Sequence, residues 1–270
     1  MIGHVEWVDF VRVESVPKPG EIVHASESWA EAAGGGAVAA VQLANLGCDT
    51  AFITALGDDD LGHRAHEDLA SRGVRLHVAW TRQPQRRGVT HVDEAGERTI
   101  TVIGEKHRPR GDDESLPWEE LHRCDCVYFT AGDVDALLKA RHARVLVATA
   151  RELPTLRRAA VELDALVGSA TDPGERYEAG GLDPPPRLVV ATSGRLGGWA
   201  QPGGPFAAAS PPGAFQDAYG AGDCFAAGLA FALARGDEPR DAIAFAARCG
   251  AAVVSGRGPY ERQLTAADEN

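Results

Sequence analysis

Short apolar runs alternate with longer Ala-rich or amphipathic stretches along most of the chain. Residues 36–47 are Ala-rich and end at Gly47, which predicts a helix, and the apolar run at 51–56 predicts a strand. A second helix and strand are predicted at 61–72 and 75–80. Continuous apolar strands that alternate with helices are typical of a parallel sheet covered on both faces. Beyond residue 123 the same pattern predicts strands at 126–129, 145–148, 165–167 and 188–191.

Residues 88–103 break this alternation. The β-rich segments 88–92 and 98–103 flank a polar turn that contains Gly96, which predicts a β-hairpin. Another polar, β-like segment is expected at 21–29. Together these segments predict a small sheet that projects from a larger body. The body is assigned residues 1–9, 34–76 and 108–270, and the small sheet residues 10–33 and 77–107.

Composition narrows the classes of partner. The 270 residues are 44% hydrophobic, enough for a packed core, and 27 Lys and Arg against 39 Asp and Glu give a formal charge of −12. This acidity opposes nucleic-acid binding by counterion release. No run approaches the roughly 20 apolar residues that span a membrane, and the five cysteines lack CxxC spacing. We therefore expect a cytoplasmic protein whose partner is a small molecule, rather than nucleic acid or a membrane.

A first glycine cluster lies at 34–36. Residues 34–39 match the G-x-G-x-x-A pattern of dinucleotide-binding proteins, with Asp58 as the later acidic residue. That pattern requires a hydrophobic strand directly before it, whereas residues 27–33 are polar in part. An NAD-dependent enzyme is therefore the weaker interpretation. The glycines still suit a close approach of the backbone to a ligand.

A second cluster, residues 217–223, precedes a long run of small residues that predicts a helix ending at Gly236. Glycines at a helix start leave backbone N–H groups aimed at one point, and the helix dipole favours an anion there. Asp223 is unusual in such a place, because a carboxylate repels an anion. It is either a helix cap or a base that removes a proton from a nucleophile, and these residues alone leave both roles open.

The run 217–225 resembles the D-T-x-G-A-G-D-x-F signature of the PfkB/ribokinase-like carbohydrate kinases. The resemblance extends over nearly the whole chain and implies a Rossmann-like three-layer αβα body with a mostly parallel sheet and a small β-sheet lid. It also implies transfer of the γ-phosphoryl group of ATP to a hydroxymethyl group of a sugar or sugar-like molecule. Four further segments resemble family motifs in the same order: 34–47, 57–62 (G-D-D-x-x-G), 96–98 (G-E-R) and 190–198 (T-x-G-x-x-G).

The resemblance implies a role for each matching residue. Arg98 has a second interpretation, pairing with Glu94 or Glu97 on the hairpin surface. Asp172 matches the acidic position of the family's N-x-x-E motif through residues 169–172. The implied groups are Asp223 as general base with the Gly220, Ala221 and Gly222 amides as anion hole; Asp9, Gly34, Gly35 and Arg98 for the acceptor; Thr192, Gly194, Gly197 and Gly222 for ATP; Asp172 for Mg²⁺; and Asp217 and Ala218 for K⁺ as a candidate second ion.

Two departures from the family pattern concern the acceptor and the ion. The Asn that normally follows the glycine pair is replaced by Val38 or Ala39, and the family's D-T is Asp217-Ala218 here. A nucleoside kinase of the same fold and a non-catalytic sugar or nucleotide sensor therefore remain alternatives to a sugar kinase. The family often uses the small sheet as a dimer surface, which implies a homodimer through 10–33 and 77–107.

Overall fold

The computed structural model describes residues 1–269, and its body is built on one nine-stranded sheet. The strand order is β13-β12-β11-β10-β9-β8-β1-β4-β5, with the strands from β11 to β5 parallel and β12 and β13 forming an antiparallel edge. The predicted mostly parallel sheet is confirmed. The strands are β1 (Ile2–Gly3), β4 (Ala51–Gly57), β5 (Arg75–Thr81), β8 (Cys126–Phe129), β9 (Val145–Thr149), β10 (Ala165–Ser169), β11 (Leu188–Thr192), β12 (Gly198–Gln201) and β13 (Gly204–Phe206).

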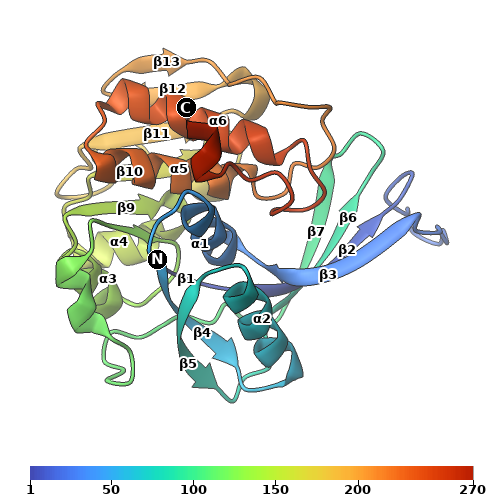
Figure 1. The fold of residues 1–270 in the computed structure, drawn as a ribbon, viewed down its shortest axis with the longest axis horizontal. Helices are drawn as coiled ribbons and strands as arrows, with labels where there is room; N and C mark the ends of the chain where they lie inside the picture. The colour runs from blue at the N-terminus through green and yellow to red at the C-terminus, as the bar shows by residue number, and fades with distance from the viewer. Residues whose placement is uncertain (270) are drawn as a thin grey trace.

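Helices cover both faces of this sheet, which gives three layers (Figure 1). Successive side chains of a strand serve opposite faces: on β10, Ala165 and Val167 pack into the core beneath α1, α2, α5 and α6, and Leu166 packs into the core beneath α3 and α4. Burial on both faces explains why the strands are continuous apolar runs. The helices are α1 (Gly35–Asn45), α2 (Asp60–Ser71), α3 (Val134–Ala140), α4 (Leu153–Ala159), α5 (Ala221–Arg235) and α6 (Pro239–Val253).

A membrane-spanning helix is not found within residues 1–269, since none of the helices there is both long enough and apolar enough.

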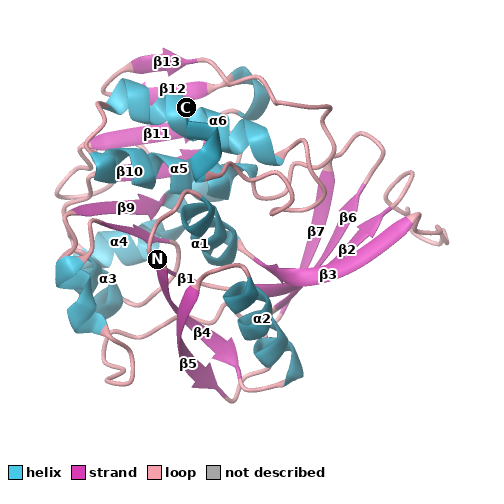
Figure 2. Cartoon of the chain, in the orientation of Figure 1, coloured by secondary structure: helices cyan, strands magenta, loops and turns pink. Residues whose placement is uncertain are grey.

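A second sheet of four strands projects from the body (Figure 2). Its order is β3-β2-β6-β7, and β6 and β7 pair antiparallel as the predicted hairpin. The strand expected at 21–29 begins later, at Glu27, because its partner β2 ends at Arg12, opposite Glu27. The strands are β2 (Glu6–Arg12), β3 (Glu27–Ala33), β6 (Arg87–Val92) and β7 (Arg98–Ile103).

The strands cross two of the expected borders between body and small sheet. The border at residue 9 falls inside β2, which lies wholly in the small sheet, and the border at residue 76 falls inside β5, which pairs with β4 in the large sheet. The glycine pattern at 34–39 is preceded by β3, a strand of the small sheet. It therefore lacks the strand of the parallel sheet that a dinucleotide fingerprint requires.

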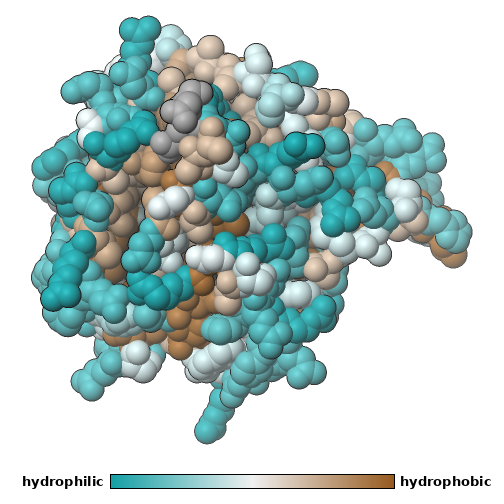
Figure 3. Space-filling view, in the orientation of Figure 1, coloured by the Kyte–Doolittle hydropathy of each residue, from teal (hydrophilic) through white to brown (hydrophobic). Residues whose placement is uncertain are grey.

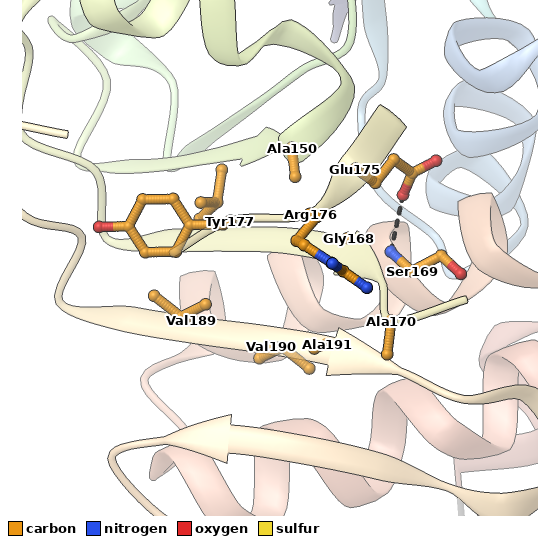
Figure 4. Close-up of a pocket in the computed structure, with 11 residues that line it drawn as sticks. Ala150, Gly168, Ser169, Ala170, Glu175, Arg176, Tyr177, Val189, Val190 and Ala191 are labelled. Atoms are coloured by element: carbon orange, nitrogen blue, oxygen red, sulfur yellow. Dashed lines mark hydrogen bonds between the residues drawn. The ribbon is translucent and has the colours of Figure 1, made fainter. Parts of the chain in front are cut away.

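The connection between β10 and β11 carries no α-helix. Its residues 170–187 form only a short 3₁₀ helix at Pro173–Glu175. A pocket of about 200 Å³ opens there on the α3 and α4 face, over β10 and β11 (Figure 4). The carboxyl end of β10 is therefore covered by a loop, and that loop supplies Glu175 to the site described next.

Candidate active site

The loop before α5 turns at Gly220, which is the N-cap of the helix. Its φ of 83° favours glycine, and a Cβ there would lie 3.0 Å from both Pro259 Cβ and Val38 Cγ1. The hydrogen bond from the Cys224 N–H to the Gly220 carbonyl (2.8 Å) is the start of the helical ladder. The N–H groups of Gly222 and Asp223 therefore lie ahead of the ladder, at the positive end of α5, where an anion is favoured.

Asp223 lies in the first turn of α5, beside Gly35 at the start of α1. A Cβ on Gly35 would lie only 2.7 Å from Asp223 Oδ1, so glycine lets the backbone approach the carboxylate. Asp223 is half-buried, and burial raises its pKa to about 6; the positive charge of Arg98 opposes this rise and the negative charge of Glu175 adds to it. Because Gly220 is the N-cap, capping does not account for Asp223. A partly open carboxylate with this pKa can accept a proton at neutral pH.

Gly34 directly follows β3 and contacts the loop before α5. Its N–H donates to the Tyr219 hydroxyl at 3.4 Å, and its φ is 86°. A Cβ at Gly34 would lie 3.2 Å from Glu6 Cγ and 3.4 Å from His4 Cδ2. Of the two glycines expected at the acceptor site, Gly35 therefore lies against Asp223, and Gly34 lies against Glu6 and His4.

Asp9 lies elsewhere. Its carboxylate accepts a hydrogen bond from Arg87 Nη2 at 3.1 Å on the small sheet. Side chains alternate along a strand, so Asp9 points to the face of β2 opposite that of Glu6 and Phe10. The Phe10 ring packs edge-on against Tyr219, which identifies its face as the one toward the α5 loop. The structure does not bring Asp9 to Gly34, Gly35 and Asp223; Glu6 occupies that place.

Arg98 extends from β7 to the loop before α5. Its Nη1 donates to the Ala218 carbonyl at 2.8 Å, and its charge acts on Asp223. Within residues 1–269 it forms no ion pair with Glu94 or Glu97. The structure therefore does not show the alternative, an ion pair of Arg98 on the hairpin surface. Arg98 instead links the small sheet to the loop before α5.

Asp217 is fully buried at the other end of the same loop. Its carboxylate accepts hydrogen bonds from the N–H groups of Tyr219 (2.8 Å) and Gly258 (3.1 Å), and burial raises its pKa. No basic side chain among the described residues pairs with it. A buried carboxylate with this donor set fits a monovalent cation, whereas the carbonyl of Ala218 already accepts the bond from Arg98.

Two carboxylates meet at Arg151, close to the end of β10. Asp172 caps the 3₁₀ helix by accepting from the Gly174 N–H, and Arg151 Nη2 pairs with it at 2.7 Å. Glu175 also pairs with Arg151, and its Oε2 accepts from the Ser169 N–H at 2.7 Å (Figure 4). Glu175 is the more enclosed of the two, with 12% of its side chain exposed against 36% for Asp172, and its charge is the one that acts on Asp223.

A metal cage made of protein side chains alone is missing from residues 1–269, where no three His, Cys, Asp or Glu residues are grouped to hold an ion. Mg²⁺ usually binds one or two carboxylates and the phosphates of a nucleotide, and it keeps several waters. Glu175, whose charge acts on Asp223 at the start of α5, fits a Mg²⁺ ion of this kind.

The expected nucleotide loop follows β11, which ends at Thr192. The loop is closed by the hydrogen bond from the Ser193 N–H to the Gly197 carbonyl at 2.7 Å, and Gly194 and Gly197 have φ values of 54° and 89°. A Cβ on Gly197 would lie 2.0 Å from the carbonyl oxygen of Phe206. The loop lies at the carboxyl edge of the parallel strands, where ligands bind in open α/β sheets.

Sequence reasoning missed His4, Glu6 and Glu175. His4 and Glu6 follow β1 and begin β2, so their place depends on the passage of the chain from one sheet to the other. The alternation of side chains along β2 could have found Glu6, because it shares a face with Phe10. Glu175 comes to Ser169 only because the connection after β10 folds back without a helix, and no local signal in the sequence shows this.

The whole site can be compared with known proteins. Residues 1–158 and 159–266 match the pfkB family of carbohydrate kinases. The chain is 32% identical to an ATP-dependent ribose-1-phosphate kinase of Halopiger xanaduensis. The alignment is 282 positions long and covers 95% of this chain and 91% of the relative. Its fold is similar to that of Thermotoga maritima ribokinase (TM-score 0.74, 20% identity, 98% and 95% coverage) and of Arabidopsis thaliana ribokinase complexed with ribose and ATP (TM-score 0.72, 20% identity, 98% and 95% coverage).

Proposed function

The chain belongs to the pfkB family of carbohydrate kinases, and we propose that it transfers the γ-phosphoryl group of ATP to a hydroxymethyl group of a sugar or sugar-like molecule. The observation that carries this proposal is the placement of Asp223 between the anion-binding start of α5 and Gly35. A phosphoryl group bound at the start of α5 and a hydroxyl group bound at Gly35 would therefore both lie next to this carboxylate.

Asp223 acts as the general base in this proposal. Its carboxylate accepts the hydroxyl proton as the sugar oxygen forms a bond to the γ-phosphorus, while the bond to the departing ADP breaks. The N–H groups of Gly222 and Asp223 donate to the oxygens of the transferred phosphoryl group, whereas the Ala221 N–H already donates to the Ala218 carbonyl at 3.5 Å. Glu175 would hold a Mg²⁺ ion that binds with the nucleotide, and such an ion would neutralise charge on the phosphates.

The acceptor is identified by an ADP-release assay over a panel of neutral pentoses and hexoses, nucleosides, sugar acids and sugar phosphates. Pentoses and their phosphates come first, because the Halopiger relative is named for ribose 1-phosphate. Turnover with nucleosides alone would favour the nucleoside kinase. Ligand binding without turnover of any compound would contradict the proposal and favour the sensor.

The rate is expected to follow the ionisation of Asp223. Its pKa of about 6 means that the base is charged above neutral pH and becomes protonated as the pH falls. We therefore expect kcat/KM to be level from about pH 7 to pH 8 and to fall about tenfold per unit below about pH 6. Initial rates across this range, with the assay enzymes in excess, measure the profile. A level profile down to about pH 5 would mean that the carboxylate has an ordinary pKa of about 4 and would contradict the argument.

Asp217 is proposed to hold a monovalent cation, K⁺, beside the anion-binding loop. Its buried charge has only backbone N–H partners, so a bound cation would stabilise the loop. Replacing K⁺ with tetramethylammonium, which is too large to enter, should lower turnover several-fold, and Asp217→Asn should remove the difference between the two salts. Equal rates of the unmodified protein in both salts would argue against the ion.

The small sheet is proposed as the surface of a homodimer. β7 is its open edge, and all six residues of β7 are exposed, among them Ile100, Val102 and Ile103. Ile22, in the loop at the tip between β2 and β3, is 90% exposed, and Figure 3 shows hydrophobic surface at this tip. An unprotected strand edge with apolar side chains favours pairing with another chain.

Sedimentation velocity at micromolar concentration is expected to show a dimer, and Val102→Lys is expected to shift it to the monomer. Leu138→Lys, at an equally exposed leucine of α3 on the body, is the matched control. A monomer of the unmodified chain at that concentration would count against the interface.

A further inference from the structure

A group of charged side chains lies beside His4, outside the residues to which the reaction has been assigned. Glu152, in the turn after β9, is almost completely buried, with 2% of its side chain exposed. Lys106 Nζ donates to Glu152 Oε1 at 3.2 Å, and Arg108 Nη1 donates to Glu152 Oε2. A single buried carboxylate therefore holds two cations, which both come from the loop that follows β7. We call Lys106, Arg108 and Glu152 the cationic cluster.

The cationic cluster presents its positive groups outward. The side chain of Lys106 is 16% exposed and that of Arg108 is 40% exposed, against 2% for Glu152, so the two cations lie nearer the solvent than the carboxylate that they share. One carboxylate cannot balance two cations. Arg86 adds a further positive charge, although Glu6 accepts its Nε–H at 2.7 Å and balances it. A local positive excess is notable in a chain whose formal charge is −12, and it attracts an anion.

His4 connects the cationic cluster to the proposed reaction site. Arg108 Nη1 also donates to the Gly132 carbonyl at 3.4 Å, in the segment that begins with Thr130 and runs beside the chain before His4. Burial, and after it the charges of Lys106, Arg86 and Arg108, holds the pKa of His4 well below the usual value, so His4 is neutral. A Cβ on Gly35 would lie 3.7 Å from His4 Cε1 and 2.7 Å from Asp223 Oδ1, so the imidazole and the catalytic carboxylate flank the same glycine. His4 therefore lies close to both the cationic cluster and Asp223.

Two buried polar atoms near Gly35 and the chain before His4 have no hydrogen-bond partner within residues 1–269. They are His4 Nδ1 and Thr130 Oγ1. Only 9% of the His4 side chain is exposed. Thr130 is adjacent to the chain before His4, because its N–H donates to the Ile2 carbonyl at 2.9 Å. Buried polar atoms are nearly always paired, so these two indicate a polar molecule that belongs here.

We propose that the acceptor is an anionic sugar, and that Lys106 and Arg108 bind its phosphate or carboxylate group while its hydroxymethyl group lies at Asp223. This inference rests on the proposed function and narrows its substrate class. Lysine and arginine are the side chains that bind such groups most strongly, through charge-assisted hydrogen bonds. Glu152 is a positioning residue that holds the two cations apart and in place before the substrate arrives.

Isothermal titration of the unmodified protein with ribose, ribose 1-phosphate and gluconate tests the proposal without any need for turnover. At least one of the two anionic compounds should bind about tenfold tighter than ribose, or more, and the better of the two identifies the anionic group. Ribose binding as tightly as both would overturn the inference, even if ribose is phosphorylated. If an anionic sugar binds but no compound is phosphorylated, the proposed reaction fails and the anion site stands.

Single substitutions test the residues. Lys106→Met and Arg108→Gln should each weaken binding of the preferred anionic sugar, and raise its KM, by about tenfold or more, with little change for ribose. Lys106→Arg should retain the preference. Arg110→Gln is the matched control, because Arg110 lies in the same loop but pairs with Asp112 on the surface. If Lys106→Met and Arg108→Gln both fold and keep the preference for the anionic sugar, the assignment is wrong. If they unfold, the test rests on Lys106→Arg and the unmodified protein, which should both bind an anionic sugar more tightly than ribose.

Discussion

Asp223→Asn is expected to lower kcat by about 10²–10⁴-fold while leaving nucleotide affinity nearly unchanged. The amide has almost the same size as the carboxylate but cannot accept the hydroxyl proton. The backbone N–H groups at the start of α5 do not depend on the side chain, so the phosphates keep their donors. The loss should appear in single-turnover rates with saturating ATP and acceptor, and nucleotide binding should be measured by titration with ADP.

The thermal stability of Asp223→Asn provides an independent check. A pKa raised to about 6 means that the folded chain carries an unfavourable buried charge above that pH, and the charge is absent below the ordinary carboxyl pKa of about 4. The variant should therefore melt at a higher temperature than the unmodified protein near pH 8, with the difference vanishing near pH 4. Asp183→Asn, at an exposed aspartate that forms no ion pair within residues 1–269, is the control. Full activity in Asp223→Asn would falsify the assignment of the base.

Gly35→Ala is expected to lower kcat/KM by about 10²-fold with only a small loss of stability. The added methyl group would lie 2.7 Å from Asp223 Oδ1, which is the end of a side chain that can rotate away. The fold can accommodate this movement, but the reaction cannot, because misplacing a catalytic group by about 1 Å costs on the order of 10² in rate. Steady-state kinetics with the best acceptor, together with melting temperatures, would separate the two effects.

Gly213→Ala is the matched control for Gly35→Ala. A Cβ at Gly213 would lie at an ordinary contact distance, 3.4 Å from Ser255 Cβ, in a loop before the site. It should change neither rate nor stability appreciably. Gly35→Ala with unchanged kcat/KM would show that Asp223 and Gly35 do not need their present spacing, and the proposed geometry of the reaction would then be wrong.

The active-site loop was predictable from sequence because its geometry is local. Residues 217–223 carry their own turn, helix start and acidic residue, and the structure places Gly220 at the N-cap as a glycine with positive φ. The strands of the large sheet could also be predicted, since burial on both faces makes each of them an apolar run. The hairpin at 88–103 was identified by its β-rich segments and the turn between them.

The acceptor side could not be predicted, because it depends on pairings between distant segments. Which of Glu6 and Asp9 faces the site is decided by the face of β2 that packs on Tyr219, a residue far along the chain. Glu152 gathers two cations from the loop after β7, which neither propensity nor spacing indicates. The structure of the nucleotide side therefore follows from local sequence, whereas that of the acceptor side depends on contacts between distant segments.

The hydrogen bond from Gly34 to Tyr219 has a consequence for folding, since it joins residues that are 185 positions apart. β1, only two residues long, is an interior strand of the sheet between β4 and β8, and α1 packs on α5 in the layer above. Closing so large a loop is opposed by chain entropy and is slow compared with forming a local turn or helix. A nascent or partly refolded chain can therefore form the loop before α5 without forming a site, and enzymatic activity should return among the last properties during refolding.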